Sequence, residues 1–151
     1  MVLQENTPGV EFLPYEAPSA YPYKIKGSFT ANNIIITVPL YVVGDLTSNS
    51  HIKAYTPVIV KGSMEAGTNI EAEASITTGG DLKTGGHLTV KDYVEVGQSL
   101  IVGTFAEVQG RVVINKELKV ATYLKTKGSI ETQSIEVGEC TEYEGALELT
   151  N

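Results

Sequence analysis

The sequence predicts an all-β fold, a single-stranded parallel β-helix with a triangular cross-section. Every sixth residue from Ile34 to Ile130 is apolar, and the residues two positions further on are small or β-branched from Ala54 onward. Two inward residues at a spacing of two predict a short strand followed by a corner. Corner sequences repeat every eighteen residues, at Gly44-Asp45-Leu46, Gly62-Ser63-Met64 and Gly80-Asp81-Leu82. Three strands and three corners therefore form one coil of this β-solenoid, and about six coils are expected to stack into a rod.

The stacked coils predict an interior of three aliphatic columns, because residues one coil apart become neighbours. A helical interpretation fails, since apolar residues at spacings of six and two do not form one stripe at 3.6 residues per turn. The expected columns are Leu46, Met64, Leu82, Leu100 and Leu118; Ile52, Ile70, Leu88, Ala106 and Leu124; and Val58, Ile76, Val94, Val112 and Ile130.

The corners and the outward positions add two further expectations. Glycine recurs at the corners, where we expect it to supply the positive φ that tight turns often need. Opposite charges fall one coil apart, so each pair should be adjacent on parallel strands and worth a few tenths of a kcal/mol. The expected pairs are Lys53–Glu71, Glu65–Lys83 and Glu107–Lys125.

Composition divides the chain into three segments. Residues 1–24 are rich in proline and aromatic residues and are expected to form an extended arm. Residues 25–137 form the β-solenoid, with a slip of one residue near Gln133 that turns Ile135 and Val137 inward. Residues 138–151 form an acidic C-terminal cap or tail. The arm either covers the first coil or docks on a neighbouring subunit or surface, and the sequence leaves both alternatives open.

Charge and cysteine content exclude several classes of function. The formal net charge is -7 and the basic residues form no cluster, which argues against a nucleic-acid partner. Cys140 is the single cysteine, so neither an intrachain disulfide nor a cysteine-based metal site is expected. The first residues do not resemble a signal peptide, and no apolar run reaches the ~20 residues of a membrane helix. We expect a cytoplasmic protein, with a virion as the alternative location, and the arm gives no support for membrane contact.

The stretch GGDLKTGGHLTVKDYVEV (79–96) raises the question of a phosphate-binding loop. A P-loop requires G-x-x-x-x-G-K-[ST] between a strand and a helix, and here Lys83-Thr84 follows Leu82 with no helical pattern after it. Because both glycine pairs fall on repeating corners, we interpret them as corners and expect no bound cofactor.

One outward column carries several aromatic side chains. His51, Asn69, His87, Phe105 and Tyr123 are each eighteen residues apart. The two histidines would lie ~10 Å apart, which is too far for simple joint binding of a metal. The column is either a partner surface or ordinary solvated surface.

We find no pattern for catalysis, and expect no enzyme. No pair of carboxylates in register and no Ser-His-Asp order supports hydrolysis. What remains is a candidate assembly interface that combines the arm, one outer face and the aromatic column. Its residues are Phe12, Tyr15, Tyr21, Tyr23, Ile59, His87, Tyr93, Phe105, Val113 and Tyr123.

Two segments resemble the core of the bactofilin family: GDLKTGGHLTVKDYVEVG (80–97) and GSIETQSIEVGECTEYEG (128–145). The resemblance covers roughly residues 25–145 and implies a non-enzymatic cytoskeletal solenoid that polymerises end to end. The arm, which lacks an obvious membrane anchor, and the acidic C-terminal end depart from that pattern. The hexapeptide acyltransferases also have triangular coils. However, the position after each inward aliphatic lacks their glycine, and no hexad from 34 to 130 is interrupted by a loop that could carry a catalytic histidine.

The sequence therefore predicts a structural protein, a rigid β-solenoid that self-assembles into a filament or scaffold. Its partner would be a second copy of the chain or a larger protein assembly. The alternative is a virion or surface accessory protein, a decoration or fibre module that the arm anchors to a larger shell. An acyltransferase-like enzyme is the third interpretation, and the departures from that family disfavour it.

Overall fold

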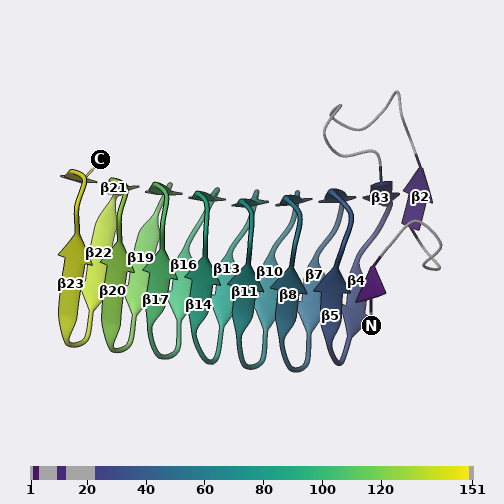
Figure 1. Ribbon diagram of the computed structural model, residues 1–151, viewed down its shortest axis with the longest axis horizontal. Coiled ribbons are helices and arrows are strands. Elements are labelled where there is room, and N and C mark those ends of the chain that lie inside the picture. Colours follow the sequence, from purple (N-terminus) through teal and green to yellow (C-terminus); the bar gives the residue numbers. More distant parts are fainter. Residues whose placement is uncertain (1, 4–9, 13–22, 150–151) are drawn as a thin grey trace.

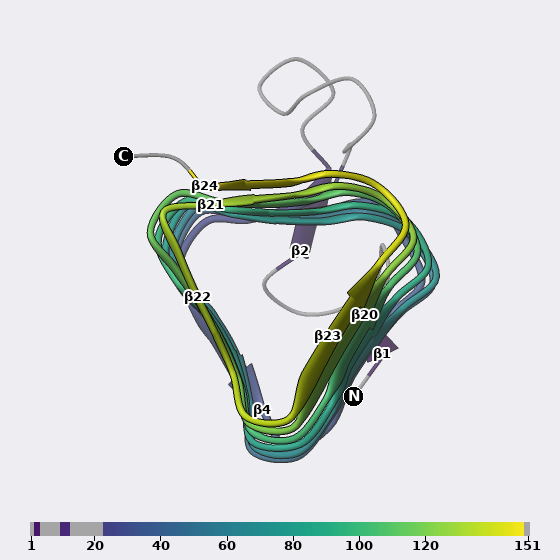
Figure 2. The same ribbon diagram turned by 90° about the vertical axis from the view of Figure 1, so that its left-hand side faces the viewer.

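The structure is a computed structural model that describes residues 2–3, 10–12 and 23–149, and these residues form strands and corners without a helix. The chain winds as a rod whose cross-section is a triangle, with one parallel sheet on each side (Figures 1 and 2). The predicted fold class, a single-stranded parallel β-helix, is confirmed.

Three sheets form the walls of the rod, named here A, B and C. Wall A contains β1 (Val2–Leu3), β5 (Ile34–Ile36), β8 (Ile52–Ala54), β11 (Ile70–Ala72), β14 (Leu88–Val90), β17 (Ala106–Val108), β20 (Tyr123–Thr126) and β23 (Cys140–Tyr143). Wall B contains β2 (Val10–Phe12), β3 (Tyr23–Ile25), β6 (Leu40–Val42), β9 (Val58–Val60), β12 (Ile76–Thr78), β15 (Val94–Val96), β18 (Val112–Ile114), β21 (Ile130–Thr132) and β24 (Leu147–Leu149). Wall C contains β4 (Phe29–Ala31), β7 (Leu46–Ser48), β10 (Met64–Ala66), β13 (Leu82–Thr84), β16 (Leu100–Val102), β19 (Glu117–Val120) and β22 (Ser134–Val137).

The strand register is the one expected from the eighteen-residue repeat. Met64 pairs with Leu46 on one side and with Leu82 on the other, and the same spacing holds on walls A and B. The stack has about seven coils, against the six expected, because the acidic segment beyond residue 137 adds β23 and β24. At a coil spacing of ~4.8 Å the rod is roughly 34 Å long.

The interior holds the three predicted aliphatic columns. The strands between β5 and β18 alternate buried, outward and buried positions, and Leu46, Leu82 and Leu118 are all 0 % exposed. The core cluster runs without interruption from Ile25 to Ile130. Since burial of each large aliphatic side chain contributes ~1.5–3 kcal/mol, these columns supply the main stabilisation of the rod.

The outward residues confirm the predicted register. Strand pairing places Lys53 opposite Glu71, Glu65 opposite Lys83 and Glu107 opposite Lys125. Among the described residues, close ion pairs also join Lys91 to Glu73 at 2.8 Å and Arg111 to Glu95 at 3.1 Å. These pairs are exposed, so each adds little to the stability of the fold.

The reason expected for the corner glycines is wrong. None of the glycines that the structure describes has a φ in the left-handed region. The constraint is instead the close stacking of one corner on the next. A Cβ on Gly110 would lie 2.8 Å from the carbonyl carbon of Asp92, and a Cβ on Gly128 would lie 2.6 Å from the carbonyl oxygen of Gly110. Glycine is required because successive corners touch through their backbones.

The coils at both ends are one residue shorter than the others. Leu118 pairs with Ile135 rather than with residue 136, which confirms the slip predicted near Gln133. Ile135 and Val137 pack against the core, as the slip requires. The first coil has the same shortening, since Tyr23 pairs with Leu40.

The described parts of the N-terminal segment pair with the first coil. Strand β1 adds to wall A beside β5, and β2 adds to wall B antiparallel to β3 (Figure 1). These pairings match the first of the two alternatives for the arm, a segment that covers the first coil.

Candidate functional site

The aromatic column on wall A is continuous through three rings. His87 precedes β14, Phe105 precedes β17, and Tyr123 begins β20. The ring centroids of His87 and Phe105 are 4.9 Å apart with an interplanar angle of 7°, and those of Phe105 and Tyr123 are 5.0 Å apart at 4°. Because the coils repeat at ~4.8 Å, residues of one column are held close to the stacking distance of aromatic rings. The column predicted from the eighteen-residue spacing is thus a stack of parallel rings.

Each end of this stack is tied to a glutamate of the preceding coil. The Tyr123 hydroxyl lies 3.0 Å from Oε1 of Glu107, and Nε2 of His87 lies 3.3 Å from Oε1 of Glu71. Partial burial, followed by the hydrogen bond to Glu107 and its negative charge, raises the pKa of the Tyr123 phenol. These contacts hold the two outer rings of the stack against the preceding coil.

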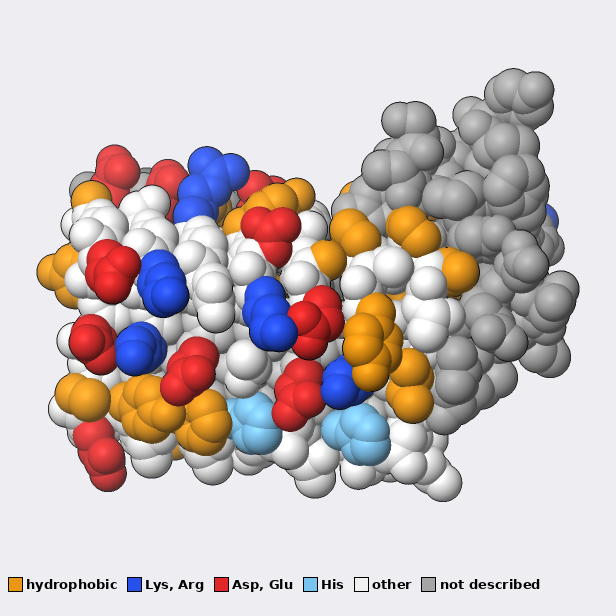
Figure 3. Space-filling view, in the orientation of Figure 1, with side chains coloured by type: hydrophobic (Ala, Val, Ile, Leu, Met, Phe, Trp, Pro, Cys, Tyr) orange, Lys and Arg blue, Asp and Glu red, His pale blue; other side chains and the backbone are white. Residues whose placement is uncertain are grey.

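The middle ring of the stack, Phe105, offers its edge rather than its faces to a partner. Both faces of Phe105 are covered, one by His87 and one by Tyr123. The His87 side chain is only 25 % exposed. A flat ligand therefore has no open face of Phe105 on which to stack. Figure 3 shows a narrow row of hydrophobic side chains and a histidine along its lower edge.

The two histidines are not brought together. Asn69 lies between them in the column, and its Oδ1 accepts a hydrogen bond of 3.1 Å from the backbone N–H of His87. In the part of the chain that the structure describes, no group of three or more His, Cys, Asp or Glu is placed to hold a metal ion.

The outward apolar residues of wall B do not form one continuous patch. Ile59 on β9 and Val113 on β18 share a column, but Thr77 and Glu95 lie between them. Tyr93 precedes β15 and belongs to a different column. All three candidate residues are half-buried, so the wall is only weakly apolar.

The candidate residues of the arm fall into two groups. Phe12 and Tyr23 pair with each other in the antiparallel ladder of β2 and β3. Tyr15 and Tyr21 lie outside the described residues.

The glycine-rich stretch at 79–96 consists of corners and strands. Gly79 and Gly80 form the corner before β13, and a Cβ on Gly79 would overlap the carbonyl oxygen of Lys61 in the preceding coil. Lys83 points outward on β13 between Glu65 and Ile101. The described residues therefore lack the strand–loop–helix geometry that a P-loop requires.

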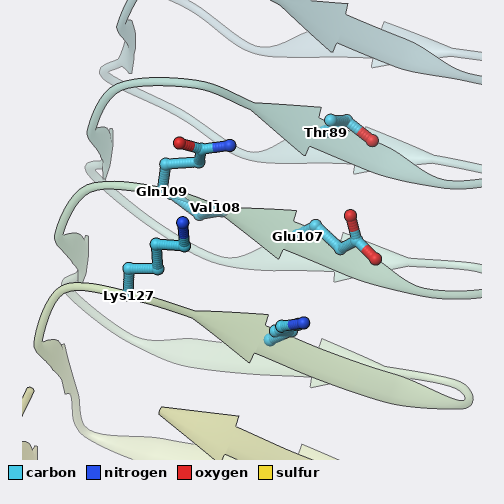
Figure 4. Close-up of a pocket in the computed structure, with 6 residues that line it drawn as sticks. Thr89, Glu107, Val108, Gln109 and Lys127 are labelled. Carbon is cyan, nitrogen blue, oxygen red and sulfur yellow. The ribbon is translucent and has the colours of Figure 1, made fainter. Parts of the chain in front are cut away.

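A shallow depression of about 220 Å³ lies on wall A. Figure 4 shows Thr89 and Glu107 on successive strands, β14 and β17, with Gln109 and Lys127 at the corners that follow β17 and β20. Lys125 completes the lining beside Glu107, its partner in the strand register. The depression is thus lined by outward side chains of wall A, including one of its oppositely charged pairs, Glu107 and Lys125.

The structure also contains a corner ladder that the sequence analysis missed. Oδ1 of Asp45 accepts the backbone N–H of Ser63 at 2.8 Å, and Oγ of Ser63 accepts that of Asp81 at 3.0 Å. Oδ1 of Asp81 accepts the N–H of Ser99 at 3.0 Å. The sequence does contain a signal for this ladder, the alternation of aspartate and serine along one corner position, at Asp45, Ser63, Asp81 and Ser99. Above, the corner repeat served only to predict the register of the strands.

The two ends of the rod differ from each other. We name β1, β2 and β4 the N-tip, because they are the last strands of their sheets at that end, and β22, β23 and β24 the C-tip. At the N-tip an antiparallel strand, β2, is the last strand of wall B. At the C-tip, Tyr143, Leu147 and Leu149 are exposed at 42 %, 36 % and 58 %. Among the described residues, the C-tip thus leaves three large apolar side chains exposed at one end of the core.

No family model matches the chain, and no curated protein or solved structure matches it either. The resemblance to the bactofilin core therefore stays a prediction. In the described ranges no helix is long and apolar enough to span a membrane.

Proposed function

We propose that this chain is a non-enzymatic structural protein, a rigid rod that joins a larger protein assembly and holds its parts at a fixed distance. The observation that carries the proposal is the unbroken core from Ile25 to Ile130, wound without an insertion loop. A rod of this kind resists bending, since its core is buried throughout and each coil is hydrogen-bonded to its neighbours along all three walls. The walls then serve as spacers, and the tips and the aromatic stack serve as contact surfaces.

The form of this function that we favour is an accessory module of a larger assembly, anchored at one end. The N-tip supports it, because β2 runs antiparallel to β3 and ends the parallel stack on wall B. A second copy cannot extend that wall by parallel pairing at this end. We expect a protein with this accessory function to be located in a virion.

The second form is a filament or scaffold made of many copies, as the resemblance to bactofilins implies. The observation that favours it is the C-tip, where the described strands of all three sheets pair on one side only. Unpaired strand edges recruit further strands unless something covers them. We expect a protein that forms such a filament or scaffold to be located in the cytoplasm.

Electron microscopy of the purified full chain separates the two forms. Discrete rods or small oligomers are expected for an accessory module, while filaments that grow without any other component would favour the second form. A variant that lacks residues 1–24 tests the arm in the same experiment. If its particles have the same size and order as those of the full chain, the arm takes no part in assembly. Globular particles without a long axis would contradict the rod itself.

A further inference from the structure

We propose that the C-tip is a docking surface for another protein that presents a β-strand edge flanked by lysine or arginine. The inference rests on the proposed function, because a rod that joins an assembly needs an end that binds. It goes further in naming the end and the chemistry of the partner.

The C-tip presents apolar side chains that a further coil would bury. We name Tyr143, Leu147 and Leu149 the apolar floor. Strand pairing sets Leu147 and Leu149 in register with Ile130 and Thr132, which are both 0 % exposed. Tyr143 is in register with Thr126, which is 2 % exposed. Inward side chains are therefore buried in the coil before the C-tip and exposed to solvent in the last coil. Exposed apolar surface of this kind, at the end of a stack, marks a contact site.

The same end presents backbone groups to a partner. In the described chain β22, β23 and β24 each pair with only one neighbour, and they lie on three sides of the apolar floor (Figure 2). A partner strand laid against any of them would form ladder hydrogen bonds, as in β-augmentation. The floor and the edges together define a geometry that suits a β-edge rather than a helix.

Charge determines which partner fits. The sequence from 134 to 149 contains five glutamates and no lysine, arginine or histidine. All five are exposed, and they are Glu136, Glu139, Glu142, Glu144 and Glu148. The preceding coil supplies some compensation, where Lys119 Nζ is 3.9 Å from Glu136 Oε2 and Lys125 stands opposite Glu142 in the strand register.

A second copy is a poor occupant for this surface. Two C-tips that met head to head would bring ten carboxylates together, and like charges in opposition disfavour a complex. The N-tip of another copy would present the antiparallel β2 on wall B, where a continued coil needs a parallel strand. A basic β-edge on a different protein satisfies the floor, the strand edges and the charge.

The test uses a charge-reversed form of the chain as the basic probe. In this basic-tip variant the five C-tip glutamates are replaced by lysine. Native chain and variant are each studied alone and then mixed, by sedimentation velocity at low and at high salt. We expect no pairing through the C-tip in either protein alone, a one-to-one complex in the mixture, and a loss of that complex at high salt, where charges are screened.

A Leu149→Asp substitution in the native chain distinguishes docking on the floor from simple charge attraction. This change makes the tip more acidic but removes an apolar contact, so we expect binding to the basic-tip variant to weaken by roughly tenfold or more. A control variant carries an equal charge reversal on the walls, at Glu65, Glu71, Glu73, Glu95 and Glu107, and should not bind. Circular dichroism melting establishes that every variant is folded before it is mixed.

Three results would overturn the proposal. They are a native chain that pairs with itself through the C-tip, a basic-tip variant that does not bind, and a wall variant that binds equally well. Self-pairing through the C-tip would lengthen the native particles but leave them rods, and the other two results leave the native particles unchanged. Globular native particles would instead contradict the proposed function, so the proposed function and this docking surface can fail separately.

Discussion

Leu82 and Leu149 both stand at inward positions of the rod, Leu82 as the first residue of β13 on wall C and Leu149 as the last residue of β24 on wall B. Leu82 is on β13 with a coil on either side and is 0 % exposed, while Leu149 is on β24 with a coil on one side and is 58 % exposed. The local sequence around each is similar, an aliphatic residue followed by polar ones. The difference arises from the number of neighbouring coils. In a stack whose units contact only their neighbours, the middle supplies stability, and the ends are left with surface that can bind.

The largest expected effect follows from placing an aspartate at both positions. Leu82→Asp buries an unpaired charge and should cost more than ~4 kcal/mol, enough to unfold much of the rod. Leu149→Asp should change the stability by no more than ~0.5 kcal/mol, because the new carboxylate stays in water. Thermal melting followed by circular dichroism measures both. Equal melting temperatures for Leu82→Asp and the native chain would contradict the position assigned to Leu82.

The corners allow the same comparison through glycine. Gly110→Ala forces a Cβ to within 2.8 Å of the Asp92 backbone in the preceding coil, and the resulting overpacking should cost ~1–3 kcal/mol. Gly27 lies in the first coil, where a Cβ would meet nothing within 4 Å. Gly27→Ala should therefore leave the stability unchanged or raise it by up to ~1 kcal/mol. Chemical denaturation of both variants measures the difference, and equal losses would mean that stacking does not explain the corner glycines.

The corner ladder should have a smaller effect. Asp81→Ala removes the acceptor of the Ser99 N–H and should cost ~1 kcal/mol, the usual net value of a hydrogen bond. Asp81→Asn retains an oxygen at the same place and serves as the matched control, with most of the stability kept. If both substitutions cost the same, the charge of Asp81 matters rather than its hydrogen bond. Equilibrium unfolding in urea resolves a difference of this size.

The sequence was sufficient to predict the core and the aromatic column. In a solenoid the residues one coil apart are neighbours, so the spacing of Leu46, Met64 and Leu82 along the chain translates directly into contact in space. The same rule placed His87, Phe105 and Tyr123 in one row before their stacking was known. Features that repeat with the coil can be read from the sequence, because one unit determines the position of all the others.

Features that do not repeat could not be predicted in this way. The pairing of β2 with β3 is antiparallel, and no periodic signal links residues 10–12 to residues 23–25. Strands β23 and β24 lie beyond the slip at Gln133, where the register used for the other coils no longer applies. The reason for the corner glycines was also missed, since the approach of two backbones depends on the coil spacing and not on the local residues. The sequence is therefore least informative at the tips, where the assembly contacts are proposed.

The smallest expected effect concerns Tyr123, near the C-terminal end of the stacked rings. Its pKa is raised in the folded rod, first by partial burial and then by the hydrogen bond to Glu107 and the charge of that carboxylate. A raised pKa means that folding favours the neutral phenol. This contribution to stability is fully present below the unfolded value near 10 and is lost as the pH rises through the higher folded value. Tyr123→Phe, which cannot ionise, should therefore lose less stability than the native chain across that alkaline range.

Absorbance of tyrosinate during an alkaline titration measures the Tyr123 pKa directly, as the difference between the native chain and Tyr123→Phe. Glu107→Gln keeps an acceptor for the hydroxyl but removes its charge, so the pKa of Tyr123 should fall part of the way toward the ordinary value. Burial among the stacked rings should hold the remainder of the shift. A Glu107→Gln variant with the full shift would assign it to burial alone, and a Tyr123 that titrates like a free tyrosine in the folded native chain would contradict the geometry of the stack.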